Sequence, residues 1–294
     1  PKAMRVNFRG QLPNGVVAKD LILALIGHIG AQGGIGYAVE YAGEAVRSLP
    51  VEGRLTLCNM SIEFSAKMGF VPPDDTTIEY LAGRAYLPRG PDWDRAVAHW
   101  QSLPSDPGAV YDREVDLDAS ALQPQVTWGI SPQQVVSVGA PVPDPANAAD
   151  AEARTLAERA LQVMGLRPGQ ALAGLPVDVA YIGSCTNARL SDLRDAARLL
   201  EGRKVAPGVQ AVCVPGSTPI KRAAEAEGLD RVFREAGFEW HESGCGYCSD
   251  LGEGRFNGLR VISTTNRNFE HRQGQGTRTH LASPATVAAS AVAG

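Results

Sequence analysis

The chain has 294 residues, of which 44% are hydrophobic and 20% charged, a composition typical of a globular protein rather than a disordered or fibrous one. Lysine and arginine together number 28 against 32 aspartate and glutamate residues, and a net charge of −4 without any basic block excludes an electrostatic surface for nucleic acid. No uninterrupted apolar run reaches about 18 residues, so we expect no transmembrane helix and no membrane partner.

The first hundred residues predict helices and short strands. Apolar residues recur on a helical period over 18–29, and a glycine-rich turn then precedes a predicted strand, Tyr37–Tyr41. A second helix is expected over 54–68, a short capped helix follows Asp74, and a further helix runs from Trp93 to Trp100. The side chains predicted to face inward from the helix over 54–68 are Leu55, Cys58, Ile62, Phe64 and Ala66.

Beyond about residue 120 strands and helices alternate. A proline-rich loop at 141–145 is followed by an amphipathic helix over 148–164. The predicted strands are 177–182, 209–214, 238–240 and 259–263, and the predicted helices are 191–200 with Ser191 as the cap, 218–226 and 230–236. This alternation predicts an α/β fold, with a parallel, doubly wound sheet that carries helices on both faces.

Five cysteines are an odd number for a chain of this length, and a disulfide framework would need a higher density. Reduced cysteines in the cytoplasm, engaged in metal binding or catalysis, are the better interpretation. Cys58 and Cys213 lie in apolar runs and are expected to be core residues. Cys185, Cys245 and Cys248 lie in polar loops that follow predicted strands.

These three cysteines predict a metal centre. Cys245 and Cys248 are separated by two residues, and the carboxyl ends of parallel strands bring Cys185 to the same edge. Three thiolates fit a four-ligand zinc site poorly but suit an iron–sulfur cluster in which one iron has no protein ligand. Such an iron can act as a Lewis acid toward a hydroxyl or carboxylate. The alternative is a structural or redox pair with Cys185 merely buried.

Two further pairs are candidates for a substrate site. Arg267 and Arg272 lie downstream of the cysteine pair, and two guanidinium groups suit a di- or tricarboxylate, although either arginine alone could be a surface or ion-pair residue. Asn59 and Glu63 are four residues apart, so on a helix they would share a face that is either a site wall or a buried polar network. The five histidines are scattered and are interpreted as structural.

Taken together, these motifs resemble the aconitase superfamily. The resemblance depends on Gly-Ser-Cys-Thr-Asn at 183–187, the later cysteine pair and Thr-Asn-Arg-Asn-Phe at 265–269, and it covers essentially the whole chain. Within the superfamily the chain is most similar to the large subunits of the branch that acts on isopropylmalate. The resemblance implies three-layer α/β/α domains with mostly parallel sheets, namely a middle domain over 1–121 and a ligand-bearing domain over 122–294.

The resemblance also implies a cofactor. A [4Fe-4S] cluster would be held by Cys185, Cys245 and Cys248. Asn59 and Asn266 match family positions that form hydrogen bonds near the cluster. The fourth iron of the cluster would bind the substrate hydroxyl and one carboxylate.

The implied reaction is that of a hydro-lyase. Glu63 would contact the hydroxyl or water on the open iron, and Arg267 and Arg272 would bind substrate carboxylate. The substrate would be a small hydroxy di- or tricarboxylate, and the reaction would interconvert 2-isopropylmalate and 3-isopropylmalate through isopropylmaleate in leucine biosynthesis. A separate small subunit would supply the catalytic serine.

Three departures from the family pattern widen the range of possible functions. Gly246 and Tyr247 occupy the positions where close relatives usually have Ser-Met, and His271 replaces an expected glycine. The chain also begins with Pro1, which matches a position well after the amino terminus of family members. We therefore expect an amino-terminal domain with acidic and histidine active-site residues to be missing. The alternatives are a hydro-lyase acting on homoaconitate, citrate or a methylmalate-type acid, and a non-catalytic zinc-binding or redox-sensing protein.

Overall fold

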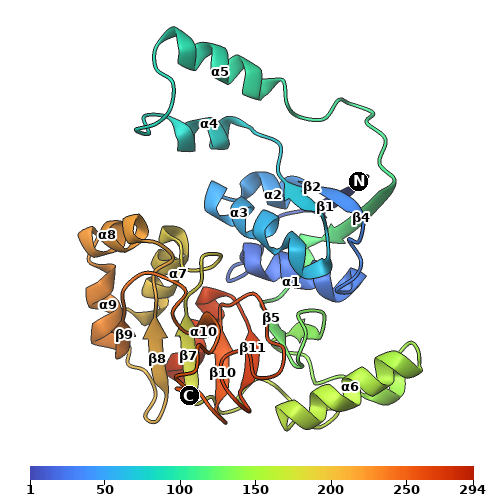
Figure 1. The fold of residues 1–294 in the computed structure, drawn as a ribbon, viewed down its shortest axis with the longest axis vertical. Coiled ribbons are helices and arrows are strands. Elements are labelled where there is room, and N and C mark those ends of the chain that lie inside the picture. Colours follow the sequence, from blue (N-terminus) through green and yellow to red (C-terminus); the bar gives the residue numbers. More distant parts are fainter.

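The structure is a computed structural model that describes residues 1–294. Its first sheet has four parallel strands in the order β3-β2-β1-β4 (Figure 1). We call residues 2–118 the first unit. Its strands are β1 (Lys2–Arg9), β2 (Tyr37–Ala42), β3 (Met68–Phe70) and β4 (Arg113–Asp118). Its helices are α1 (Ala18–Ile29), α2 (Glu44–Ser48), α3 (Val51–Met60), η1 (Ser61–Phe64), α4 (Asp75–Leu81) and α5 (Pro91–Gln101).

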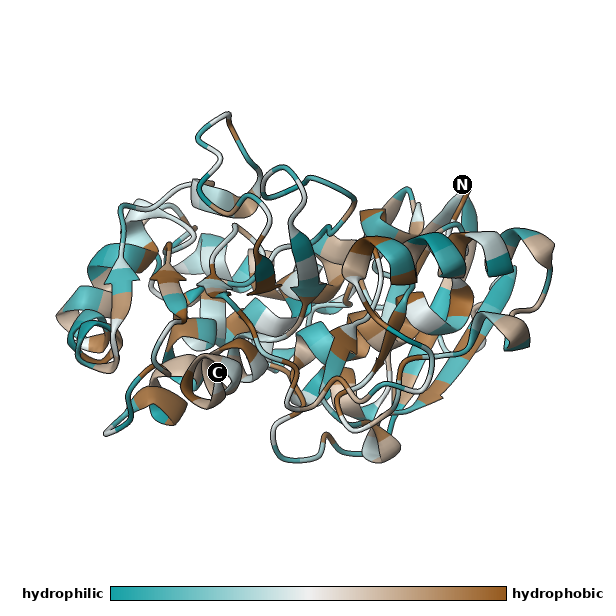
Figure 2. Ribbon diagram, turned by 90° about the horizontal axis from the view of Figure 1, so that it is seen from below, coloured by the Kyte–Doolittle hydropathy of each residue, from teal (hydrophilic) through white to brown (hydrophobic).

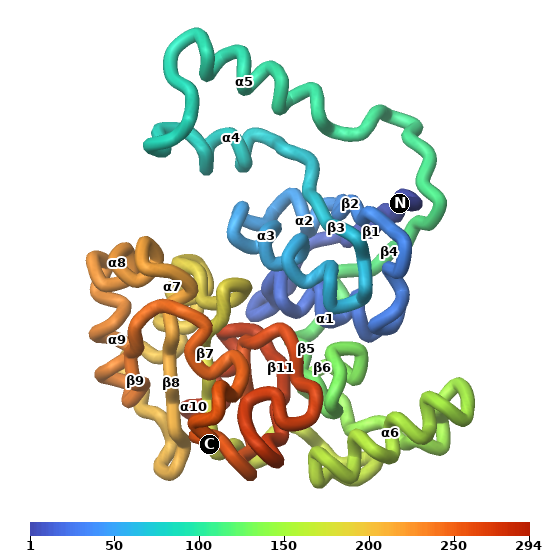
Figure 3. Tube along the Cα trace, viewed as in Figure 1, coloured from blue at the N-terminus to red at the C-terminus, as the bar shows by residue number.

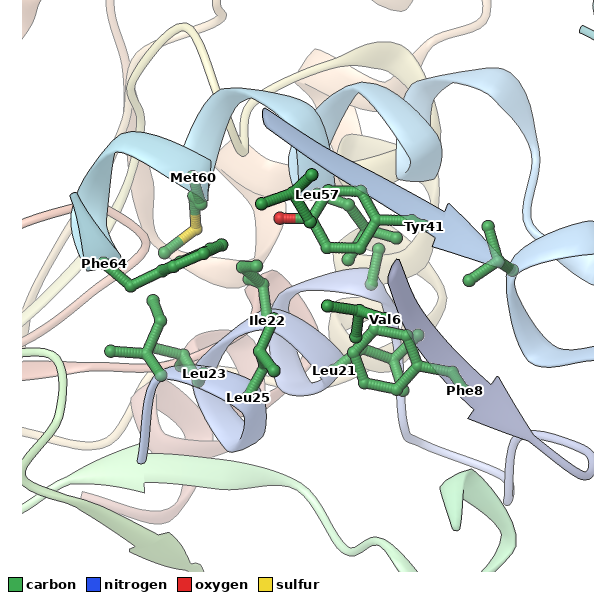
Figure 4. Packing of buried hydrophobic residues seen from close by; sticks show 14 of the residues in the cluster. Val6, Phe8, Leu21, Ile22, Leu23, Leu25, Tyr41, Leu57, Met60 and Phe64 are labelled. Carbon is green, nitrogen blue, oxygen red and sulfur yellow. The ribbon is translucent and has the colours of Figure 1, made fainter. Parts of the chain in front are cut away.

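The core of the first unit lies between one face of this sheet and helices α1, α2 and α3 (Figure 4). Alternate residues of β1 point to that face, since Val6 and Phe8 pack against Leu21 and Leu25 of α1. The apolar period of α1 therefore faces the strands and α3, as its sequence predicts. The Asp20 carboxylate accepts the Val17 N–H at 2.9 Å and so stabilises the start of the helix.

Helices α4 and α5 form an arm that extends away from the first unit (Figures 1 and 3). No residue over 71–112 is buried. The arm is held at its base, where the buried Arg54 guanidinium donates to both carboxylate oxygens of Asp74 at 2.6 and 2.8 Å. Its return segment is held at Tyr111, whose hydroxyl donates to Glu40 at 2.9 Å.

A small connecting region joins the first unit to the second sheet. It contains η2 (Ala119–Ala121), β5 (Gln125–Thr127), β6 (Val135–Ser137), η3 (Pro145–Asn147) and α6 (Ala151–Met164). Its own core packs Trp128 and Val142 against Leu161 of α6. The helix predicted over 148–164 begins at Ala151 instead, because the Asp150 side chain caps it by accepting the Ala153 N–H.

The second sheet has five parallel strands in the order β11-β10-β7-β8-β9, and we call residues 179–293 the second unit. Its strands are β7 (Val179–Ile182), β8 (Gln210–Cys213), β9 (Phe238–Trp240), β10 (Arg260–Ser263) and β11 (Arg278–Leu281). Its helices are α7 (Leu190–Leu200), α8 (Thr218–Ala226), α9 (Leu229–Ala236), η4 (Gly246–Cys248) and α10 (Pro284–Ala293).

The two faces of the second sheet are covered differently. Ile182 and Cys213 face the helices α7, α8, α9 and α10. Tyr181 and Val214, which alternate with them along the strands, face Phe256 and the loop that contains the cysteine pair. The helices therefore gather on one face of the sheet, and the loop that contains Cys245 and Cys248 lies against the other. In Figure 2 the brown segments lie mainly inside the molecule, and the connecting segments around it are mostly teal or white.

The predicted α/β class with mostly parallel sheets is confirmed, but the helices predicted on both faces of the second sheet gather on one face. The helix predicted over 54–68 ends at Met60. Of its predicted inward residues Phe64 and Ala66 are buried, whereas Leu55 and Cys58 are half-buried and Ile62 is exposed. Cys213 is buried, as expected. The sequence did not predict strands β1, β3, β4, β5, β6 and β11. The predicted boundary near residue 122 lies between β4 and β5 and stays a prediction.

None of the helices is both long enough and apolar enough to span a lipid bilayer.

The start of α7 differs from the prediction, because the helix predicted to begin at Ser191 begins one residue earlier. Ser191 lies in the first turn of α7, and its N–H donates to the Glu52 carboxylate of α3 at 2.7 Å. The cap at this end of α7 is therefore supplied partly from the other unit, which the local sequence cannot reveal.

Candidate metal centre

The loop after β7 presents Cys185 to solvent. Gly183 is required there because a Cβ atom would lie 2.2 Å from the Tyr181 hydroxyl. Ser184 is buried with a φ of 90°, a backbone conformation that is strained for a residue other than glycine. Its hydroxyl accepts the Asn187 N–H at 3.4 Å, which helps to hold the bend. The bend leaves the Cys185 side chain exposed at the edge of the sheet.

The turn that carries the other two cysteines is held by side chains from the sheet and from the arginine loop that follows β10. The Tyr181 hydroxyl donates to the Cys245 carbonyl at 3.1 Å. The buried Gln273 amide donates to the Tyr247 carbonyl at 2.7 Å, and Arg272 Nε donates to the Cys248 carbonyl at 3.0 Å. Three side-chain donors therefore restrain the backbone of the turn at Cys245, Tyr247 and Cys248.

All three cysteines are free thiols in this arrangement. Burial raises the pKa of the Cys248 thiol, Arg272 lowers it, and the neighbouring charges of Cys245 and Cys185 raise it again. Cys185 follows β7, and Cys245 and Cys248 follow β9, so all three lie beyond the carboxyl ends of strands of one parallel sheet. No three His, Cys, Asp or Glu side chains are close enough together to hold a single metal ion.

The loop after β10 approaches the loop of Cys185. Asn266 Nδ2 donates to the Thr186 hydroxyl at 2.9 Å. The other end of this amide, Oδ1, is buried and has no hydrogen-bond partner. A buried polar atom without a partner is unfavourable by about 1–3 kcal/mol, so this atom marks a place where a further group could be accommodated.

Arg267 and Glu63 form an ion pair between the two units. Arg267 Nε donates to Glu63 Oε2 at 2.8 Å, and the glutamate side chain is 6% exposed while the arginine side chain is 46% exposed. The pair uses only Nε of Arg267, so its terminal nitrogens remain available to another carboxylate. The sequence prediction that Glu63 and Arg267 meet at one site agrees with this geometry.

Asn59 and Glu63 do not share one α-helix, as the sequence had suggested. Asn59 lies exposed in the last turn of α3, whereas Glu63 lies in the 3-10 turn η1 that follows. Glu63 contacts the arginine loop directly, whereas Asn59 forms no hydrogen bond to the second unit. Of the two residues, only Glu63 therefore supports the interpretation that they form a wall of the site.

The second arginine has a partly structural position. Arg272 supports the cysteine turn through Nε, and its guanidinium lies 5.3 Å from the centre of the Phe269 ring. The preceding residue, His271, has a φ of 67°, a conformation that favours glycine. Its Nδ1 accepts the Gly276 N–H at 2.9 Å, which offsets part of the strain.

Sequence reasoning missed two residues that shape this site. Gln273 had no motif around it, and its burial and its bond to the Tyr247 carbonyl appear only in the fold. Lys19 was visible as one of two adjacent charged residues, with Asp20, at the start of an apolar helical pattern, a position that usually indicates an exposed side chain. The structure buries it completely beside the loops after β7 and β10.

Comparison with known proteins agrees with this arrangement. The profile of the aconitase family (aconitate hydratase) matches residues 1–294. The chain belongs to the aconitase family. A curated relative, 3-isopropylmalate dehydratase large subunit 1 of Bradyrhizobium diazoefficiens, is 58% identical over 295 residues that include all of this chain. The aconitase-family chain spans 62% of the length of that relative.

Proposed function

We propose that this chain is part of the large subunit of a hydro-lyase that interconverts 2-isopropylmalate and 3-isopropylmalate through isopropylmaleate. The observation that carries the proposal is the convergence of three free cysteines and the Arg267–Glu63 pair at one sheet edge, in a chain 58% identical to a large subunit of that name. The proposal extends to the cofactor, the roles of the site residues and the partner subunit.

The proposed cofactor is a [4Fe-4S] cluster held by Cys185, Cys245 and Cys248. A structural zinc site generally needs four protein ligands, and only three cysteines follow the strands of this sheet. An iron–sulfur cluster can keep one iron without a protein ligand, so three thiolates fit it better than they fit zinc.

Within this proposal each protein group has a defined task. When bound, a cluster with one iron free of protein ligands supplies a Lewis acid for the substrate hydroxyl and a carboxylate. Arg267 and Arg272 bind carboxylates through the nitrogens that their contacts leave free. Glu63 holds or transfers the proton of the departing hydroxyl, and Asn59 and Asn266 orient groups beside it.

The rest of the site is assigned to polypeptide beyond these 294 residues. The relative's name, large subunit, favours a small-subunit partner, and we assign the catalytic base to a serine of that partner. The part of the relative that this chain does not span is the source we propose for further acidic and histidine groups. We place the division between the two domains of this chain near residue 122, between β4 and β5.

The test of the cofactor is anaerobic reconstitution of the purified chain with iron and sulfide. We expect about four iron and four acid-labile sulfide per chain, with the visible absorption of an iron–sulfur protein. Cys245→Ser should abolish both. Cys58→Ser is the matched control, because burial raises the pKa of the Cys58 thiol to about 11 and it should remain an uncoordinated thiol.

A colourless protein after reconstitution, or about one zinc and no sulfide, would contradict the proposal. The substrate is tested separately, with the complete large subunit and its small subunit. Isopropylmalate should be turned over faster than citrate, homoaconitate or a methylmalate-type acid. Faster turnover of one of those acids would keep the hydro-lyase chemistry and change the substrate.

A further inference from the structure

Lys19 is a buried charge that the proposed chemistry does not use. It is the second residue of α1, in the first unit, and its side chain is fully buried. Removing an ammonium group from water is strongly unfavourable unless every one of its N–H groups finds a partner. A lysine in such a position is therefore expected to have a specific set of acceptors.

The acceptors all belong to the second unit. Lys19 Nζ donates to Asn187 Oδ1 at 3.0 Å and to the Thr264 and Thr265 carbonyls at 3.0 and 2.9 Å. An ammonium group has three N–H donors, so these contacts satisfy it completely. No carboxylate lies within ion-pair distance, and the charge is stabilised by the dipoles of two loops.

These two loops are the ones that carry the candidate site. Asn187 is two residues after Cys185, and Thr265 is two residues before Arg267. The loops come from β7 and β10, which are neighbours in the sheet. The Nζ atom of Lys19 therefore connects the loop that contains Cys185 to the loop that contains Arg267.

The contact is reinforced from α3. Asn187 Nδ2 donates to the Thr56 hydroxyl at 3.3 Å, while its Oδ1 accepts from Lys19. Thr56 is buried, and its hydroxyl also lies 3.3 Å from the Thr186 carbonyl. Both ends of the Asn187 amide are thus held by the first unit, which fixes the side-chain orientation and the backbone that follows Cys185.

The electrostatic surroundings agree with a role beyond packing. Burial lowers the pKa of Lys19 to about 8, while the charges of Asp192, Glu63 and Asp20 favour its charged form. Through Asn187 the ammonium is bound to the loop that contains Cys185, two residues earlier. A buried positive charge so placed would stabilise negative charge gathered there.

We propose that Lys19 is a positioning residue for the metal centre. Its hydrogen bonds fix the position of the Cys185 loop relative to the Arg267 loop, and its charge compensates the negative charge of the cysteine cluster. This inference rests on the proposed function for the identity of the bound group. The restraint on the two loops does not depend on that identity and can be measured in the protein without a cofactor.

The first arm of the test is hydrogen exchange in the cofactor-free chain. Lys19→Met keeps the length of the side chain and removes its donors and charge. We expect amides over 183–189 and 263–268 to exchange about tenfold faster or more, with β8 and β9 unchanged. Lys67→Met, at an exposed lysine of the same unit, is the matched control and should leave every segment unchanged.

If Lys19→Met does not fold, Thr56→Val replaces it. This variant keeps the shape of the side chain and removes its hydrogen bonds to the second unit. The amides over 183–189 should then exchange faster, by a smaller factor than in Lys19→Met. Unchanged exchange over 183–189 and 263–268 in a folded variant would overturn the inference.

The second arm uses the chain reconstituted with iron and sulfide. Lys19→Met should hold less iron and sulfide, and the cluster that remains should have a more negative reduction potential because a nearby positive charge is gone. A purely structural role would change the occupancy but not the potential. An unmodified chain that takes up no iron and sulfide contradicts the proposed function, whereas equal occupancy and potential in Lys19→Met and the unmodified chain contradict the role of Lys19.

Discussion

The two units contribute to the candidate site in different ways although both are built on parallel sheets. The second unit supplies groups from loops that follow its strands, among them Cys185, Cys245 and Arg267. The first unit supplies groups from helices, with Lys19 on α1 and Glu63 on η1. The strand ends of one sheet thus hold the proposed cofactor ligands, while helices of the other unit orient and complete the site.

This comparison explains why four contacts between the units converge on the same edge. Glu52 caps α7, Thr56 and Lys19 hold Asn187, and Glu63 pairs with Arg267. Each contact joins a helix of the first unit to a loop or helix start that follows β7 or β10. Loss of a cysteine in the second unit should remove the cofactor itself, whereas a substitution in the first unit should change orientation, proton transfer or the extent of cofactor loading.

The largest expected effect is at Glu63. In the complete enzyme, Glu63→Gln should lower kcat by about 100-fold or more, because the variant cannot accept or donate the proton assigned to this carboxylate. The iron and sulfide content should remain that of the unmodified protein. Parallel loss of iron and activity would break the comparison, since it would make Glu63 a determinant of cofactor binding.

The second prediction concerns pH and the support of the second unit. His280 Nδ1 donates to the Thr127 carbonyl at 2.7 Å, so Nε2 accepts from Arg260 at 2.9 Å and the ring is neutral. Burial lowers the pKa of His280 from 6.5 to about 4. In the unfolded chain the ring takes up a proton below pH 6.5, while in the folded chain it stays neutral down to about pH 4.

The stabilising contribution of neutral His280 is therefore present above pH 6.5 and lost as the pH falls to about 4, by about 3 kcal/mol in total. Urea unfolding of the cofactor-free chain across this pH range measures the change. His280→Gln should remove this component of the pH dependence, and His99→Gln, on the exposed arm, should retain it. An identical profile in both variants would assign the acid sensitivity to other groups.

A third prediction sharpens the role of the sheet beneath the cysteine turn. Tyr181→Phe removes the hydroxyl that donates to the Cys245 carbonyl, and the free energy of unfolding should fall by about 1 kcal/mol. The variant should also lose its reconstituted cluster faster in air, because one of the three restraints on the turn is gone. Cluster lifetime is followed by the visible absorbance, and an unchanged lifetime would show that the other two restraints suffice.

The smallest effect is expected on the arm of the first unit. Trp93 and Trp100 form an edge-to-face pair with ring centres 5.6 Å apart, but neither is buried. Trp100→Ala should lower the free energy of unfolding by at most about 1 kcal/mol. Thermal unfolding checks this value, and a loss several times larger would mean that the arm is part of the cooperative core of the first unit.

Features that depend on local patterns were predictable from the sequence. They are the cysteine and arginine motifs, the α/β class and the strands β7, β8, β9 and β10. Alternating apolar runs mark strands, and the polar loops between them stand out. The helix over 54–68 failed because the chain passes into the 3-10 turn η1 after Met60 and leaves it at Ser65 with a φ of 67°, which the apolar pattern does not reveal. Cys58 lies in an apolar run yet is only half-buried, since the outward face of α3 includes it.

Two things about this protein follow from the order of its residues alone: where the candidate ligands and carboxylate-binding groups lie along the chain, and that strand ends would bring them to one edge. The tertiary structure decided which side chains complete the site across the two units. The partners of Lys19, Asn187 and Gln273 could not be predicted, because these side chains bind segments up to 246 residues away. Hydrogen bonding between distant segments leaves no periodic trace in a sequence, so only the folded arrangement reveals it.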